Sequence, residues 1–405
     1  MAGRLPPCIV LGVESQIGLG IVRELGAAGV PVIGMTHDPH AIGLASRYLS
    51  RAVIVATPRS QQTVDTINEL AREVGDCCLL TVSEVTLEWL QSQRHQFRGV
   101  VPILPSPEAL AIVLDKQRTL AIAREVGIRV PESTEPMSMA DVERIARSFA
   151  FPAVLKWKDP ARIAPRLSAH KLDLVKAEYV NTAEEFLQAA RRYEPVGSWP
   201  LVQEYCAGRG LGQFFFMHRG QAVRRFQHLR IAEWPPEGGF SSVCDSVPLD
   251  QHVELQQKSI ALLQRIGWEG VAMVEYRLDA DTGVSRLMEV NGRFWGSFPL
   301  AVQCKAGFAL LAYSLQGRGE MPALQRLRER IRSRMVATEL KRLLRIWLQA
   351  DRIRDRRFVV RPLPELWRFV RDFFRPRVHY FVWSLDDPKP FVRDMQNVLR
   401  KVIRR

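Results

Sequence analysis

The feature that most constrains the fold is a predicted β-hairpin made of two apolar runs, residues 271–278 and 284–294. Both runs are rich in β-branched, aromatic and aliphatic side chains, and the Asp-Ala-Asp-Thr-Gly segment between them is typical of a turn. If the turn is centred on Thr282, Glu275 lies directly opposite Glu289 on the same face. The pattern therefore predicts two neighbouring carboxylates within apolar strands.

The same face of this hairpin gathers further polar side chains. Because side chains alternate along a strand, Glu289, Asn291 and Arg293 point to one face, and the residues between them point to a core. Like charges directly opposite each other cost up to about 1 kcal/mol, so the two glutamates require a compensating cation. Oxygen donors without His or Cys favour Mg²⁺ (or Mn²⁺) over Zn²⁺. We expect Arg293 to face the anions that this metal holds; a solvated edge hairpin is the alternative.

This pattern resembles the ATP-grasp superfamily, whose members carry a Glu on one strand and an E-x-N-x-R run on the next. Here these residues are Glu275, then Glu289, Asn291 and Arg293, and the run MEVNGRFWGS at residues 288–297 resembles the carboxylate–amine ligases of that superfamily. The resemblance implies that both glutamates and Asn291 hold Mg²⁺. It also implies that Arg293 contacts the transferring phosphate or an acyl-phosphate.

The resemblance further implies an α/β fold in three parts. We expect a Rossmann-like pre-ATP-grasp domain in residues 1–105, an ATP-grasp fold with two α+β halves enclosing ATP in residues 106–317, and a basic helical extension in residues 318–405. Residues 7–56 support the first domain, because strand, glycine turn, helix and strand alternate as in a parallel sheet. The glycines lack the G-x-G-x-x-G spacing, which favours tight packing over nucleotide binding there. The prolines of VVPILPSP mark the first boundary.

Two lysines are predicted to bind the phosphates of ATP. Lys156 ends the apolar strand FPAVLK, where only an anion would justify an ammonium group deep in a cleft, and the strand resembles the phosphate-binding strand of the superfamily. Lys116 stands on a helix before GIRVP and resembles a second phosphate-binding lysine; a solvated surface lysine is the alternative. Residues 158–166 depart from the family pattern, because a basic, proline-containing segment replaces the usual glycine-rich loop.

The apolar strand LVQEYC, residues 201–206, resembles the hinge between the two ATP-grasp halves. The resemblance implies that Glu204 accepts a hydrogen bond from the adenine amino group and that the backbone of Tyr205 and Cys206 pairs with the ring edge. Gln203 belongs to the same nucleotide-binding segment. The acidic residue that often binds the ribose is missing from the following AGRGLG.

A second hairpin, turning at residues 218–220, leads to Arg230 and then to the Pro-, Gly- and Ser-rich residues 234–242. That composition is typical of a shaped, movable loop. We expect the loop, together with Arg230, to receive the substrate carboxylate and to close over the γ-phosphate. An ordinary surface loop is the alternative.

The net charge of +14 is concentrated in one region. Residues 318–405 hold 24 of the 57 Lys and Arg and 10 of the 43 Asp and Glu, so residues 1–317 hold 33 of each and are neutral. The basic region interleaves arginines with aromatic residues on predicted helices. It could dock on an anionic membrane or a membrane-bound partner, or pack on the body or form a homodimer. Nucleic-acid binding is the least favoured interpretation, because no known module accompanies the charge.

The remaining composition indicates a globular, soluble protein. No run of about 20 apolar residues or signal peptide is found, which predicts a cytoplasmic location, with attachment to the inner face of a membrane as an addition. The six cysteines lack a C-x-x-C pair and are expected to be reduced thiols without a metal.

Together these features predict an ATP-dependent ligase that joins a small-molecule carboxylate to an amine through an acyl-phosphate. The alternative is a non-catalytic ATP-binding protein or scaffold that its basic tail places at a membrane or on nucleic acid. A biotin-dependent carboxylase is disfavoured, because the usual C-terminal module of those enzymes is not recognised. The sequence does not identify the acid or the amine.

Overall fold

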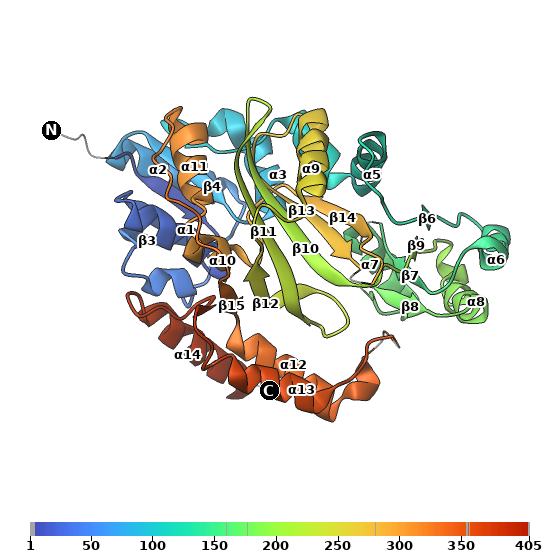
Figure 1. Cartoon of the computed structure of the whole chain (residues 1–405). Helices are drawn as coiled ribbons and strands as arrows, with labels where there is room; N and C mark the ends of the chain where they lie inside the picture. Colours follow the sequence, from blue (N-terminus) through green and yellow to red (C-terminus); the bar gives the residue numbers. More distant parts are fainter. Residues whose placement is uncertain are drawn as a thin grey trace.

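The structure is a computed structural model that describes residues 5–403 except 159, 176, 280, 354 and 356. Within these residues the chain forms three β-sheets with helices packed against them (Figure 1). The predicted α/β fold class is confirmed. The predicted domain boundaries near residues 105 and 317 stay predictions.

The first part of the chain forms the predicted parallel sheet, with strand order β3-β2-β1-β4-β5. Its strands are β1 (Cys8–Leu11), β2 (Val32–Thr36), β3 (Arg51–Ile54), β4 (Cys77–Thr81) and β5 (Val100–Pro102). Its helices are α1 (Gln16–Ala27), α2 (Gln61–Val74) and α3 (Glu84–Gln93), with 3-10 turns at Ile42–Ala45 and Arg94–Gln96. A Cβ on Gly18 would lie 2.3 Å from the carbonyl oxygen of Gly12, so the glycine turn serves tight packing of strand and helix.

Helices α4 (Pro107–Leu114) and α5 (Lys116–Glu125) lead to a small antiparallel sheet with the order β6-β9-β7-β8. Its strands are β6 (Ser133–Thr134), β7 (Ala153–Lys156), β8 (Glu178–Val180) and β9 (Leu201–Glu204). The helices of this part are α6 (Met139–Ser148), α7 (Pro160–Ala169) and α8 (Ala183–Arg191), followed by a 3-10 turn at Glu194–Val196. The sheet presents the ends of β7 and β9 to the rest of the molecule.

The third sheet is the largest, with the order β14-β13-β10-β11-β12-β15-β16. Its strands are β10 (Arg209–His218), β11 (Gln221–Trp234), β12 (Phe240–Ser246), β13 (Gly270–Leu278), β14 (Ser285–Asn291), β15 (Arg332–Arg334) and β16 (Val378–Tyr380). Helix α9 (Val253–Ile266) packs on one face. After β14 the chain forms α10 (Phe298–Gln303), α11 (Phe308–Leu311) and a π-helical turn (Ala312–Gln316).

The parallel sheet and the large sheet share one hydrophobic core. Leu19 of α1 belongs to the same buried cluster as Phe214 of β10 and Phe298 of α10. Trp295 stacks on Phe214 with 4.0 Å between the ring centroids. A second cluster fills the space between α9 and the opposite face of the large sheet. The large sheet is therefore held on both faces and gives its polar side chains a rigid support.

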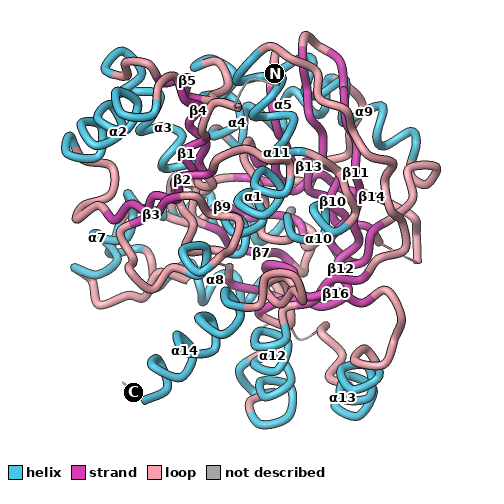
Figure 2. The backbone as a smooth tube through the Cα atoms, turned by 90° about the vertical axis from the view of Figure 1, so that its left-hand side faces the viewer, coloured by secondary structure: helices cyan, strands magenta, loops and turns pink. Residues whose placement is uncertain are grey.

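The basic C-terminal region contains α12 (Val336–Leu348), a 3-10 turn (Ala350–Arg352), α13 (Pro362–Arg371) and α14 (Lys389–Ile403). These three helices form the lower edge of the molecule in Figure 1, and Figure 2 shows them extending beyond the sheets. Strands β15 and β16 of this region extend the large sheet, so the region is built into the fold. Among the described residues, no helix has the length and apolar content needed to cross a membrane.

Candidate active site

The β13–β14 hairpin pairs Glu275 with Glu289, as the sequence predicts. Nearer the turn the register shifts by one residue: Tyr276 pairs with Leu287, which leaves Met288 as an extra residue in β14. The predicted turn centre is therefore wrong, because the strands near the turn pair one residue out of the predicted register. The extra residue Met288 forms a bulge, and beyond it Glu275 and Glu289 pair as predicted.

The polar residues after Glu289 form a hydrogen-bonded row. Asn291 Nδ2 donates to Glu289 Oε1 over 3.1 Å, and Arg293 Nη2 donates to Asn291 Oδ1 over 3.0 Å. Arg293 Nε lies 3.3 Å from Glu84 Oε1, the first residue of α3 in the parallel domain. Burial raises the pKa of Glu84, although Arg293 opposes this rise. The structure thus brings the predicted residues together and links them to the first domain.

Glu84 was missed by the sequence analysis. A signal for it exists, because it begins a helix just after the carboxyl end of a parallel strand, where α/β proteins place their binding residues. Its proximity to Arg293 depends on how two distant parts of the chain pack, and that packing leaves no local pattern.

Arg230 crosses β10 to reach a carboxylate on β13. Its Nη2 donates to Glu275 Oε2 over 2.5 Å, and its Nη1 donates to Glu233 Oε1 over 3.1 Å and to the carbonyl oxygen of Gly239 over 2.8 Å. A Cβ on Gly210 would lie 2.5 Å from Arg230 Cδ, so glycine in β10 opens the passage. Arg230 therefore binds carboxylates of the chain itself, and its predicted role towards a substrate carboxylate stays a prediction.

Two further residues complete this buried charge cluster. Arg277 Nη1 lies 3.0 Å from Glu233 Oε2, so Glu233 bridges Arg277 and Arg230. Both residues were missed, because strands β11 and β13 are separated by β10 and their contact depends on side-chain reach across it.

The paired glutamates have pKa shifts of opposite direction. Burial raises the pKa of Glu275, although Arg230 opposes the rise. Surrounding protein would also raise the pKa of Glu289, but Lys116, the hydrogen bond from Asn291, Arg230 and Lys156 outweigh it and lower that pKa. Glu289 is thus the carboxylate that the site holds most firmly in its charged form.

Lys156 at the end of β7 lies among these charges. Its Nζ donates to Gln203 Oε1 on β9 over 3.0 Å. Burial lowers the pKa of Lys156 to about 8, helped by the nearby ammonium group of Lys116 and opposed by Glu289. Lys116 stands at the first position of α5, after the capping residue Asp115. The two predicted lysines therefore lie close enough to each other and to Glu289 to form one electrostatic unit.

The predicted adenine segment lies beside Lys156 at the end of β9. Glu204 Oε1 forms an ion pair with Arg286 of β14 over 2.7 Å, which joins the small sheet to the large one. Gln203 is 1% exposed, and its Nε2 has no hydrogen-bond acceptor among the described residues. Burial, followed by Glu204, raises the pKa of the Cys206 thiol to about 11. A buried donor without an acceptor fits a ligand with acceptor nitrogens, such as a purine.

Tyr205 connects the same segment to the C-terminal region. Its hydroxyl group donates to Asp355 Oδ2 over 2.7 Å, and the guanidinium carbon of Arg357 lies 5.3 Å from the centroid of its ring. The side chain is thus held by the extension, and the predicted adenine contact concerns its backbone alone.

Most of the basic segment after Lys156 belongs to helix α7, which stands where the family pattern has a glycine-rich loop. Arg166 Nη2 donates to the carbonyl oxygen of Val196, within the small-sheet part of the molecule. Lys158 Nζ instead donates to Gln117 Oε1 over 3.0 Å, next to Lys116. Asp159 lies outside the described residues. Lys158, which precedes the helix, therefore lies nearer to Lys116 in its contacts than does Arg166, whose contact is with Val196.

The predicted loop at residues 234–242 is shorter than expected, because Trp234 ends β11 and Phe240 begins β12. Lys341 Nζ lies 4.7 Å and the guanidinium carbon of Arg345 5.3 Å from the ring of Trp234, so helix α12 covers one end of this turn. The other end supplies the Gly239 carbonyl oxygen to Arg230.

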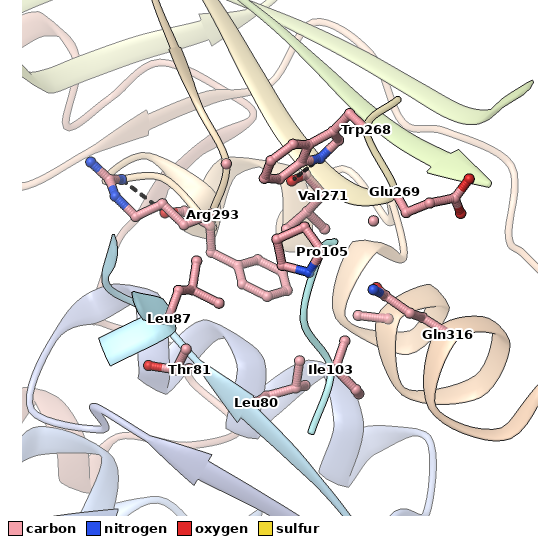
Figure 3. Close-up of a pocket in the computed structure, with 14 residues that line it drawn as sticks. Leu80, Thr81, Leu87, Ile103, Pro105, Trp268, Glu269, Val271, Arg293 and Gln316 are labelled. Carbon is pink, nitrogen blue, oxygen red and sulfur yellow. Dashed lines mark hydrogen bonds between the residues drawn. The ribbon is translucent and has the colours of Figure 1, made fainter. Parts of the chain in front are cut away.

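Figure 3 shows a cavity beside the site, where the parallel domain meets β13 and the end of β14. Leu80, Leu87, Ile103 and Trp268 line it, and Arg293 lies at its edge with the guanidinium group directed away from the apolar side chains. This cavity is thus an apolar seam between domains, and the charged side chains converge outside it.

The candidate site offers two carboxylates and one amide as possible ligands for a metal ion. No group of three or more His, Cys, Asp and Glu side chains is arranged as a metal site in the part of the chain that the structure describes. The carboxylates of Glu275 and Glu289 and the amide oxygen of Asn291 are hard oxygen donors, as Mg²⁺ prefers when substrate phosphates complete its shell. The residues present therefore fit Mg²⁺ together with a nucleotide.

A parallel sheet, a small antiparallel sheet and a large, mostly antiparallel sheet, with Lys156 of the small sheet near the carboxylates of the large one, are the arrangement of the ATP-grasp fold. The chain has this fold. The biotin carboxylase domain of 2-oxoglutarate carboxylase from Hydrogenobacter thermophilus, in complex with MgADP, ADP and bicarbonate, is similar with a TM-score of 0.61 and 14% identity over 82% of this chain and 74% of that one.

Two further solved structures show the same likeness. N5-carboxyaminoimidazole ribonucleotide synthetase in complex with ADP matches with a TM-score of 0.60 and 11% identity, over 82% of each chain. An L-amino acid ligase from Bacillus licheniformis matches with a TM-score of 0.53 and 16% identity, over 78% of this chain and 74% of that one. No protein-family model matches the sequence, and no curated protein is similar to it. At these identities the likeness is one of fold.

Proposed function

We propose that this chain is an ATP-dependent carboxylate–amine ligase. The observation that carries the proposal is the pairing of Glu275 with Glu289 beside Lys156, in the fold shared with ligases and carboxylases. Two adjacent carboxylates and two adjacent lysines suit a ligand with both a metal ion and phosphates.

Each predicted residue has a part in this proposal. Glu275, Glu289 and Asn291 would hold Mg²⁺, which supplies charge neutralisation between the phosphates when bound. Lys116 and Lys156 would bind phosphate oxygens. Glu275 Oε2 accepts a hydrogen bond from Arg230, so Glu275 would hold the metal ion with its other oxygen. Gln203 to Cys206 would contact the adenine, in keeping with the buried Gln203 Nε2 that has no acceptor in the described structure.

The proposed reaction has two steps. The substrate carboxylate attacks the terminal phosphorus of ATP, so that an oxygen–phosphorus bond forms as the bond to ADP breaks. The amine nitrogen then attacks the acyl carbon, and the amide forms as phosphate leaves and the nitrogen loses a proton. Lys116, Lys156 and Arg293 would neutralise the phosphate oxygens, as phosphoryl transfer requires.

The test is ADP formation by the purified chain with MgATP and a panel of amino acids, dipeptides and sugar acids, each with and without amines. Biotin with bicarbonate belongs in the panel, because biotin carboxylases share the fold. We expect ADP that depends on a substrate pair and falls about 100-fold or more in Glu289→Gln. The exposed Glu69→Gln is the matched control and should retain full activity.

A second candidate is a non-catalytic ATP-binding protein, favoured by helix α7 at the place of a glycine-rich phosphate loop. It predicts nucleotide binding by calorimetry without ADP formation for any substrate. Binding that requires Lys156, with no turnover across the panel, would support this candidate against the ligase.

A further inference from the structure

Helix α12 partly reverses the polarity of an ordinary surface helix, because charged residues share its inward face with the apolar Leu343 and Ile346. Its inward face carries Glu339, which is 1% exposed and forms an ion pair with Arg334 over 2.6 Å. The inward Arg342 is 4% exposed. Its outward face carries four large apolar residues at helical spacing, namely Leu340, Leu344, Trp347 and Leu348, with exposed fractions of 47%, 50%, 47% and 73%.

Helix α13 repeats this reversal. Its Glu365 turns inward to Arg342 of α12, with 2.6 Å between Oε2 and Nη1, and Phe369 packs on the guanidinium group of Arg334. Its outward residues are Leu363, Leu366, Trp367 and Val370, and Phe374 follows at 83% exposure. Both helices therefore turn charged side chains towards the body, joined in α12 by Leu343 and Ile346, and both leave apolar stripes in water.

The two stripes lie on neighbouring helices. The inward ion pair between Arg342 and Glu365 ties the helices side by side, and α12 packs on β11 and β12 with the same face. Figures 1 and 2 show both helices at the lower edge of the molecule, with α12 next to the large sheet. A contiguous exposed apolar surface of this kind marks an interaction site.

The charge around the stripes decides between partners. Among the described residues 336–377, the exposed ionisable side chains other than histidine are one acid, Asp351, and seven bases: Lys341, Arg352, Arg357, Arg361, Arg371, Arg375 and Arg377. A second copy of the chain would bring the same positive charge against itself, which opposes association of these faces. An anionic surface attracts each base.

We propose that α12 and α13 form a docking face for a membrane that contains anionic lipids. Apolar side chains flanked by arginines, with Trp347 and Trp367 in the stripes, match helices that lie in the headgroup region. The body of the chain stays on the water side, because the inward faces of both helices are held by the large sheet and by each other. This docking face would add a membrane location to the proposed ligase. The docking proposal does not depend on the chemistry of the candidate active site.

The test is co-sedimentation of the full chain with vesicles of phosphatidylcholine alone and with vesicles in which phosphatidylglycerol replaces part of it. We expect the chain to bind the anionic vesicles more strongly than the neutral ones. We also expect binding to the anionic vesicles to fall as the salt concentration rises. The triple variant Leu363→Ser, Trp367→Ser, Phe374→Ser should lose about 10-fold or more of this binding, and so should Arg371→Glu, Arg375→Glu, Arg377→Glu.

The controls are matched in exposure and chemistry but lie elsewhere. Ile54→Ser with Met137→Ser removes two exposed apolar side chains from other parts of the molecule, and Arg147→Glu reverses an exposed arginine of α6. Both should leave vesicle binding unchanged. Equal sedimentation with and without anionic vesicles would overturn the proposal. So would light scattering that shows a dimer in the wild type and a monomer in the Leu363, Trp367, Phe374 variant, because the face would then belong to a second copy.

Discussion

The candidate active site and the C-terminal region both gather charged side chains, but they arrange them differently. In the C-terminal region the signs alternate: Arg332 lies between Asp245 and Asp372, and Arg334 pairs with Glu339. In the site the signs are grouped, with Glu275 beside Glu289 and Lys116 beside Lys156. Charges of alternating sign neutralise each other within the protein, whereas charges of one sign that are grouped together are neutralised by a ligand of the opposite sign.

The largest expected effect on stability concerns the most buried ion pair of this comparison, Arg334 with Glu339. Arg334→Met should lower the free energy of unfolding by about 3–5 kcal/mol, because it leaves the buried Glu339 without its partner. Glu289→Gln should lower the unfolding free energy by only about 1 kcal/mol or less, because this exposed carboxylate meets its cationic neighbours through contacts that solvent screens. Urea denaturation of both variants measures the difference.

The double variant Arg334→Met, Glu339→Leu is the control for the first substitution. Removing both charges should recover most of the lost stability, since no charge then stays buried alone. Equal destabilisation by Glu289→Gln and Arg334→Met would show that the grouped charges are structural as well.

A smaller effect concerns Glu24 of α1, a buried carboxylate that belongs to neither arrangement. One oxygen accepts from Leu310 N over 2.9 Å, and the other has no partner among the described residues. Burial raises the pKa of Glu24 from 4.5 to about 7. Between these two values the folded state binds more protons than the unfolded state, so this group makes stability fall as pH rises.

Glu24→Gln should remove that dependence. We expect the variant to gain up to about 3 kcal/mol relative to the wild type at pH 8 and little at pH 4, measured by urea denaturation across this range. The exposed Glu69→Gln should show no such gain. A gain of the same size at both ends of the range would contradict the titration of Glu24.

The smallest expected effect concerns the position of Arg230 within the candidate site. Gly210→Ala places a Cβ 2.5 Å from Arg230 Cδ and should cost about 1–2 kcal/mol, because Arg230 is fixed by three hydrogen bonds. Nucleotide affinity should fall with it, as Glu275 loses its position. Gly296→Ala is the control, because its Cβ would meet nothing within 4 Å. Unaltered thermal unfolding and nucleotide binding in Gly210→Ala would mean that Arg230 can move without consequence.

Local patterns explain which features could be predicted from the sequence. The hairpin, the parallel sheet and helix α2 follow from periodicity and turn residues, and the pairing of Glu275 with Glu289 follows from the hairpin. Helix α7 was missed because it begins at Pro160 and contains Pro165, a residue that removes a helical hydrogen bond. The partly reversed polarity of α12 was also not predicted, since the apolar stripe reads from the sequence as the buried face.

Contacts across strands and domains account for the other omissions. Arg230 reaches Glu275 only because Gly210 lies between them, and glycine within a strand was the available signal. Glu84 reaches Arg293 from another domain. Such contacts depend on the assembled fold, and no spacing along the chain encodes them.

The C-terminal region touches the nucleotide segment at Tyr205, through Asp355, and the turn beside Arg230 at Trp234, through Lys341 of α12. The helices that carry the apolar stripes therefore share side-chain contacts with both ends of the candidate site. Thermodynamic reciprocity gives this arrangement a definite consequence: whatever factor a membrane introduces into nucleotide affinity, the nucleotide introduces into membrane affinity. Nucleotide binding and membrane binding are then thermodynamically coupled, so that each changes the affinity of the other by the same factor.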